Sequence, residues 1–173
     1  GSAVLFGMSK ILKEKKIEHI VEMDTDLSSH PKELIRNLKF FNKEKLDLLI
    51  MSRYLHGSKI INWPLRRRIF SFLSNKLAYF LLRVKVSDYT MGYRIYSKKA
   101  VEYVVKNCGK VGDEFIVLSE ILAELNYANF KINDIRTTFT NREKGSSSVN
   151  IKLIYQSLIG IFKIYKNIKS KKI

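Results

Sequence analysis

Three acidic side chains alternate at the end of an apolar segment, in the stretch IVEMDTDLSSHP. Alternation along an extended strand would place Glu22, Asp24 and Asp26 on one face, where their negative charges repel one another. A cation or a hydrogen-bond donor among the three side chains would relieve that repulsion. A strand end with solvated carboxylates and an N-cap gives the same pattern, so the Asp-x-Asp tripeptide is a weak signal by itself.

A second candidate site lies in NWPLRRRIFSFLSN, where Pro64 begins a predicted helix. Arg66, Arg67 and Arg68 fall in the first turn of that helix, where the positive end of the helix dipole disfavours cations. An anion bound at this end would offset the misfit, and guanidinium groups suit phosphate. A solvated basic turn is the alternative.

The segment SDYTMGYRIYSKKAV, residues 87–101, combines polar and charged side chains with one glycine. Asp88, Thr90 and Arg94 surround Gly92, where a strand or turn would need close approach of the backbone to another group. We therefore regard these three polar residues as candidates for a ligand site.

Residues 130–150 read as a strand as far as Phe139 and then as a polar loop that contains Arg142. Such a loop is either plain surface or a mobile flap over a ligand. If the loop is a flap, Arg142 is the candidate residue for contact with the ligand.

These candidates are distributed over alternating helix and strand patterns in a chain of 173 residues, which is long enough for one domain with a substantial core. The alternation predicts an α/β domain with a mostly parallel sheet flanked by helices. The apolar run at 46–54 is typical of a strand buried on both faces. The expected order is a helix over 2–15, a strand over 17–23, a helix over 31–41, a strand over 46–54 and a helix over 64–83.

The charge is strongly basic, with 32 Lys and Arg against 16 Asp and Glu and a net charge of +16. This excess predicts attraction to polyanions such as nucleic acid, anionic lipid or phosphorylated ligands. No helix-turn-helix, zinc or aromatic RNA-binding signature is present, which argues against nucleic acid. The single cysteine excludes an intramolecular disulfide.

The C-terminal residues 151–173 form a predicted helix with interleaved apolar and lysine residues and no acidic residue. Its longest uncharged run is too short to span a bilayer. The pattern suits a helix lying on an anionic membrane surface, and equally a core-packed helix with a basic end. We divide the chain accordingly into a domain over 1–150 and this helix over 151–173.

Taken together, the segments resemble the dolichol-phosphate mannosyltransferase family, inverting glycosyltransferases with the A-type fold. The resemblance rests on six stretches in the family's order and on an acidic residue, Glu120, in SEILAEL. The six stretches are GSAVLFGMSK, EMDTDLSSHPKEL, MSRY, WPLRRRIFSFLSN, SDYTMGYRIYSKKAV and FTNREKGSSS.

The resemblance assigns roles on the donor side. Asp24 and Asp26 match the family's Asp-x-Asp, which holds Mg²⁺ or Mn²⁺ against the donor diphosphate. Glu22 is expected to be only a neighbour of that site. The other residues that match the donor side of the family's site are Asp88, Thr90, Arg94, Glu120 and Arg142.

On the acceptor side, Arg53, Arg67 and Ser71 match the residues that bind the acceptor phosphate. Arg67 and Ser71 are four residues apart and so share one face of the predicted helix. Two positions depart from the family pattern: Met91 stands where Ser is usual, and Ser148 replaces a Lys of the flap.

The resemblance implies transfer of a sugar from a nucleotide donor, GDP-mannose first, to a polyprenyl or dolichyl phosphate at the cytoplasmic face of a membrane. No catalytic base is needed, because a monophosphate acceptor is already ionised near neutral pH. Catalysis would then consist of alignment and charge neutralisation by the metal and by Arg53, Arg94 and Arg142.

Two alternatives remain open: the same chemistry with another donor such as UDP-glucose, and a catalytically silent, basic membrane-binding module. The second follows from a further expectation, that the domain over 1–150 is N-terminally incomplete and lacks the family's first βα units, which hold the nucleotide base.

Overall fold

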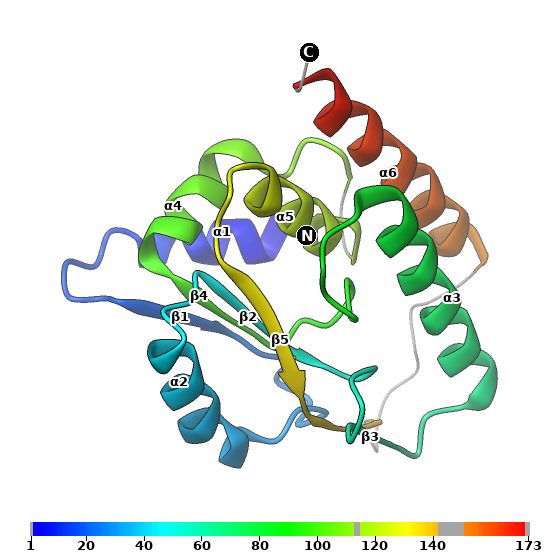
Figure 1. Ribbon diagram of the computed structural model, residues 1–173, viewed down its shortest axis with the longest axis horizontal. Coiled ribbons are helices and arrows are strands. Elements are labelled where there is room, and N and C mark those ends of the chain that lie inside the picture. Colours follow the sequence, from blue (N-terminus) through cyan, green and yellow to red (C-terminus); the bar gives the residue numbers. More distant parts are fainter. Residues whose placement is uncertain (1, 113–114, 142–150, 172–173) are drawn as a thin grey trace.

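The computed structural model describes residues 2–112, 115–141 and 151–171. Helices cover both faces of a mixed sheet (Figure 1). The helices are α1 (Ser2–Ile11), α2 (Leu34–Lys43), α3 (Leu65–Leu82), α4 (Lys98–Asn107), α5 (Phe115–Tyr127) and α6 (Ile151–Ser170), with a 3-10 turn at Pro31–Glu33. The strands are β1 (His19–Glu22), β2 (Leu48–Ser52), β3 (Lys59–Ile61), β4 (Arg94–Ser97), β5 (Ile132–Arg136) and β6 (Thr138–Thr140).

The main sheet has the strand order β1-β4-β2-β5. β2 and β5 are parallel, whereas β4 is antiparallel to both β1 and β2. The expected α/β architecture is therefore present, but the sheet is mixed rather than mostly parallel: β1, β2 and β5 run in one direction, and β4 between β1 and β2 makes both of its own pairings antiparallel. The remaining described strands, β3 and β6, form a separate parallel pair.

The direction of β4 determines where the site forms. The chain leaves the sheet at the end of β2, passes through β3 and α3, and re-enters at the same edge, with Arg94 opposite both Glu22 and Ile50. The carboxyl ends of β1, β2 and β5 thus meet the amino end of β4. Loops at this edge bring together segments that are far apart in the sequence, as is usual for ligand sites of open α/β sheets.

The core is centred on β2, whose residues are all buried, as its apolar run predicts. α1, α4 and α5 lie on one side of the sheet and α2 on the other (Figure 1). Tyr93, Ile95 and Tyr96 are also fully buried and extend the core along β4.

α6 lies beside α5 and α3 (Figure 1). Ile161 and Ile164 are buried in these contacts, and Gly160 lies so close to Ile116 that an added Cβ would be 2.4 Å from its side chain. One face of this helix is therefore packed against the domain. No helix in the described ranges is both long enough and apolar enough to cross a bilayer.

The apolar residues that mark α3 in the sequence point mostly away from the core. Leu65, Ile69, Phe72, Leu73 and Phe80 are all exposed. The buried positions of α3 are instead a small residue and a polar one, Ala78 and Asn75.

Candidate functional site

The centre of the site is an ion pair between the end of β2 and the loop before β4. Arg53 is 8% exposed and Asp88 is fully buried. Arg53 Nε and Nη2 donate to the two carboxylate oxygens of Asp88 at 2.7 and 2.8 Å, and Nη2 also donates to Thr90 Oγ1 at 2.7 Å. Burial alone would raise the pKa of Asp88, but the charge and hydrogen bonds of Arg53 hold that pKa below its ordinary value.

Three aromatic rings surround the Arg53 guanidinium. Its central carbon lies 5.1 Å from the centroid of Trp63 and 5.5 Å from the centroids of Tyr54 and Phe139. Cations are attracted to the faces of aromatic rings, most strongly where water is excluded. The rings and Asp88 together fix the orientation of this buried charge.

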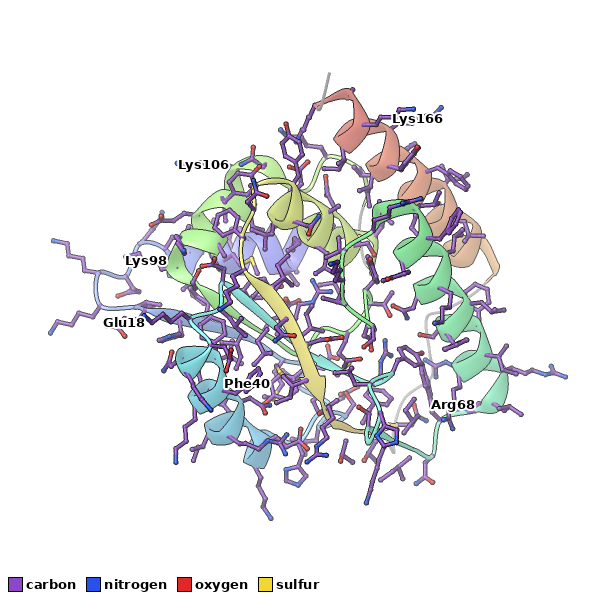
Figure 2. The ribbon with its side chains drawn as sticks, in the orientation of Figure 1. Glu18, Phe40, Arg68, Lys98, Lys106 and Lys166 are labelled. Carbon is purple, nitrogen blue, oxygen red and sulfur yellow. The ribbon has the colours of Figure 1, made fainter. Side chains whose placement is uncertain are left out.

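Arg67 reaches the same group of rings from the first turn of α3. Its guanidinium carbon lies 5.7 Å from the centroid of Trp63. Arg67 is half-buried, whereas Arg66 and Arg68 on either side are exposed, and Figure 2 marks Arg68 on this outer part of α3. The helix therefore selects Arg67 out of the three, as expected from 100° of rotation per residue.

Ser71 lies one turn further along α3, beside the side chain of Tyr54. The buried Tyr54 hydroxyl has no hydrogen-bond partner of good geometry in the part of the chain that the structure describes. Burial raises the pKa of Tyr54, and Arg53 and the neighbouring Ser71 side chain counteract part of that rise. Of the three predicted acceptor residues, Arg53 contacts both Tyr54 and Trp63, Arg67 contacts Trp63, and Ser71 lies beside Tyr54.

α3 is held to the loop before β4 by Asn75, which is buried. Its Oδ1 accepts from the backbone N–H of Tyr89 at 2.5 Å, and its Nδ2 donates to the carbonyl of Ser71 at 2.8 Å. This residue connects the predicted acceptor helix to the loop that carries Asp88 and Thr90.

The acidic segment lies at the same edge of the sheet, but not on one strand face. β1 ends at Glu22, before the two aspartates, because the chain turns there. Asp26 Oδ1 accepts from the backbone N–H of Ser28 at 3.0 Å, which closes the turn. Leu27 within it has a left-handed φ of 58°, which is unfavourable for a residue with a Cβ.

Asp24 packs against Gly92. A Cβ added to Gly92 would lie 3.6 Å from Asp24 Oδ1, which is ordinary van der Waals contact, so this position does not require a glycine. Burial lowers the pKa of Arg53, but Asp88 raises it above its ordinary value, and Tyr54 and Asp24 contribute less in the same direction. Asp24 therefore lies beside the loop that carries Asp88 and Thr90.

Glu22 makes its contacts within the sheet, as expected of a residue that only neighbours the site. Its carboxylate accepts from the Tyr96 hydroxyl at 2.7 Å. Burial raises the pKa of Glu22, and Arg94 and the Tyr96 hydrogen bond reduce the rise.

Two of the predicted donor-side residues make their contacts within the protein. Arg94 is fully buried and donates to three backbone carbonyls, those of Met91, Tyr89 and Leu118, at 2.8 to 2.9 Å. Glu120 accepts from the backbone N–H groups of Gly109 and Lys110. In this structure Arg94 therefore shapes the loop before β4, and Glu120 shapes the loop between α4 and α5. Arg142 and Ser148 lie outside the described residues.

The donor set for a metal consists of the two aspartates. Among the described residues no group of three or more His, Cys, Asp and Glu side chains is placed to hold a metal ion. Two carboxylates in a turn fit a cation such as Mg²⁺, which commonly takes one or two carboxylates and completes its coordination with substrate phosphates and water.

Sequence reasoning missed the aromatic part of the site and its connection to α3. Trp63, Phe139, Tyr54 and Asn75 have no charge and no diagnostic spacing. The available signal was composition, because Trp63 is the only tryptophan of the chain and directly precedes the predicted helix.

This edge of the sheet therefore combines a carboxylate turn with a buried and a half-buried arginine beside aromatic rings, within an A-type α/β fold. The chain belongs to glycosyl transferase family 2, whose sequence model matches residues 1–105.

Two curated relatives cover most of the chain. It is 33% identical over 150 residues to a polyprenol monophosphomannose synthase of Mycolicibacterium smegmatis, an alignment that covers 87% of this chain and 56% of the relative. It is 33% identical over 168 residues to a dolichol-phosphate mannosyltransferase of Pyrococcus furiosus, covering 95% of this chain and 44% of the relative. The chain thus spans about half the length of these relatives.

Proposed function

We propose that the protein transfers mannose from GDP-mannose to a polyprenyl phosphate, with inversion at the sugar. The observation that carries this proposal is that the candidate residues for both ligands meet at one sheet edge. Arg53 and Arg67 approach the same indole ring, and Asp24 lies against Gly92 in the loop that also carries Asp88 and Thr90. The names of the two relatives support the choice of mannose and of a polyprenyl acceptor.

In this proposal Asp24 and Asp26 hold Mg²⁺ or Mn²⁺, which when bound would neutralise the leaving diphosphate. Arg53, Arg67 and Ser71 bind the acceptor phosphate, whose ionised oxygen is the nucleophile. Asp88 and Thr90 fix Arg53 in place for this contact. Catalysis then depends on alignment and on preorganised charges, and no protein base is required. Arg142 remains a proposed donor-side ligand.

We propose that the reaction takes place at the cytoplasmic surface of a membrane. The exposed apolar face of α3 adjoins the acceptor residues, and Arg66 and Arg68 lie at its edges. Figure 2 marks Lys166 on the neighbouring helix α6, where Phe162 and Tyr165 are also exposed. Apolar side chains with flanking cations suit insertion at the surface of an anionic bilayer. This arrangement would bring a lipid-linked phosphate to Arg67.

Comparison of two neighbouring arginines tests the acceptor assignment. In the full-length protein, Arg67→Ala is expected to reduce transfer to a polyprenyl phosphate by about 2–4 kcal/mol of transition-state stabilisation. Arg66→Ala removes the same charge from an exposed position and should have a much smaller effect. The measurement is kcat/KM with radiolabelled GDP-mannose, repeated with UDP-glucose to identify the donor. Equal losses in the two variants would mean that only bulk positive charge matters.

A further inference from the structure

Trp63 occupies the short connection between β3 and α3. The backbone is constrained on both sides, because Asn62 has a left-handed φ of 54° and Pro64 is the N-cap of α3. The indole is half-buried and packs on Phe139 of β6, with 5.4 Å between the ring centroids. The ring is thus held between the start of α3 and the strand that leads to residue 142.

Both predicted acceptor arginines contact this one ring. The guanidinium carbon of Arg53 lies 5.1 Å from its centroid and that of Arg67 lies 5.7 Å away. Asp88 already balances the charge of Arg53, and each guanidinium is attracted to the indole. A phosphate beside the ring could accept hydrogen bonds from both guanidinium groups.

The indole also carries a donor from which no described residue accepts. Trp63 Nε1 is buried and has no hydrogen-bond partner within the described ranges. An indole nitrogen can only donate, and a buried donor without an acceptor is unfavourable. The Tyr54 hydroxyl, on another ring around Arg53, has no partner of good geometry among the described residues, although the Ser71 side chain lies beside it. Unsatisfied donors beside two cations are what a group with several acceptor oxygens would satisfy.

We propose that Trp63 is an acceptor-binding residue. Its ring sets the separation of Arg53 and Arg67, and its indole N–H donates to an oxygen of the monophosphate held between them. This inference rests on the proposed function and adds a neutral donor to its acceptor site. It assigns Trp63 no part in binding the nucleotide sugar.

Two substitutions separate the ring from the N–H. Trp63→Phe keeps an aromatic face for both arginines and removes only the donor, whereas Trp63→Leu removes both. With the full-length protein, we expect Trp63→Phe to raise KM for citronellyl phosphate about tenfold while kcat and KM for the nucleotide sugar change less than about twofold. Trp63→Leu should lower kcat as well, because the arginines lose their common support.

Binding is measured independently by fluorescence, since the wild-type spectrum minus that of Trp63→Phe isolates the emission of Trp63. Citronellyl phosphate should change this emission saturably, and citronellol should not. Inorganic phosphate tests whether the charged phosphate group, without an isoprenyl chain, is enough to change the emission of Trp63. Thermal unfolding of both variants checks that they remain folded.

The outcomes distinguish this inference from the proposed function. If wild type and Trp63→Phe have the same KM for citronellyl phosphate, the N–H does not bind the acceptor and the inference fails, while the proposed function stands. If the wild type neither binds nor uses any isoprenyl phosphate, both fail. A loss of nucleotide-sugar affinity in Trp63→Phe would place the residue on the donor side and also overturn the inference.

Discussion

Two ion pairs of similar length but different burial allow the energetic role of the Arg53–Asp88 pair to be measured. Arg53 Nε lies 2.7 Å from Asp88, and the two side chains are 7% and 0% exposed. Lys99 Nζ lies 2.9 Å from Asp47, but the lysine side chain is 69% exposed. The cation is replaced in each pair, as Arg53→Met and Lys99→Met.

Removal of Arg53 leaves a carboxylate buried without a counter-ion. Such a change typically costs about 3–5 kcal/mol, which is a large part of the 5–15 kcal/mol that stabilises an average domain. Removal of Lys99 should cost about 0.5 kcal/mol or less, because solvent already screens that pair. Asp47 also keeps its hydrogen bonds from Ser97 and from the backbone of Lys131.

The pH dependence of the free energy of unfolding tests the same reasoning independently. In the wild type the lowered pKa of Asp88 stabilises the fold above the unfolded value near 3.9, and this stabilisation is lost as pH falls through the folded value. In Arg53→Met, burial would raise the pKa of Asp88 instead, so protonation at acidic pH relieves the penalty. The stability difference between the two proteins should therefore shrink between pH 7 and pH 4.

The assay is urea unfolding followed by circular dichroism at several pH values. The reasoning is refuted if Arg53→Met and Lys99→Met have equal free energies of unfolding at pH 7. It is also refuted if the deficit of Arg53→Met does not change with pH.

Two further predictions concern packing and use matched controls. Gly160→Ala should lower the free energy of unfolding by about 1–3 kcal/mol, because its methyl group would overlap α5. Gly7→Ala, which has nothing within 4 Å of the added methyl group, should raise the free energy of unfolding by about 0.4–1 kcal/mol. Both changes are measured by thermal unfolding. Asn75→Ala leaves the backbone N–H of Tyr89 buried without an acceptor and should cost about 1–3 kcal/mol in urea. Asn107→Ala loses the same kind of bond, to a carbonyl four residues earlier, and should cost about 1 kcal/mol or less. Equal costs for Asn75→Ala and Asn107→Ala would contradict the bridging role of Asn75.

Local pattern was enough for much of the fold and for the polar half of the site. The apolar run at 46–54 predicted a buried strand, and β2 lies inside it. An all-apolar strand is most stable where both of its faces are covered by other parts of the protein. The close approach predicted at Gly92, by contrast, is not required, because a Cβ added there would make only ordinary van der Waals contact with the Asp24 carboxylate. The charged side chains carried a signal because their chemistry is visible in the residue type itself.

Tertiary structure decided what the side chains contact. The antiparallel entry of β4 depends on long-range pairing, and it brings Asp88 to Arg53 across a sequence separation that no periodicity encodes. The same packing fully buries Arg94, so its guanidinium donates to backbone carbonyls. The rings around Arg53 come from three different segments, and only their meeting at one sheet edge makes Trp63 part of a site.

The orientation of α3 shows the same division. Helical spacing of Leu65, Ile69 and Phe80 predicted the helix correctly, but periodicity cannot say which medium covers an apolar face. Asn75 settles the orientation here, because its buried amide bonds to the loop before β4 and turns the apolar residues outward. The sequence by itself thus determined the elements and the charged groups, whereas the contacts among distant segments determined which of those groups meet.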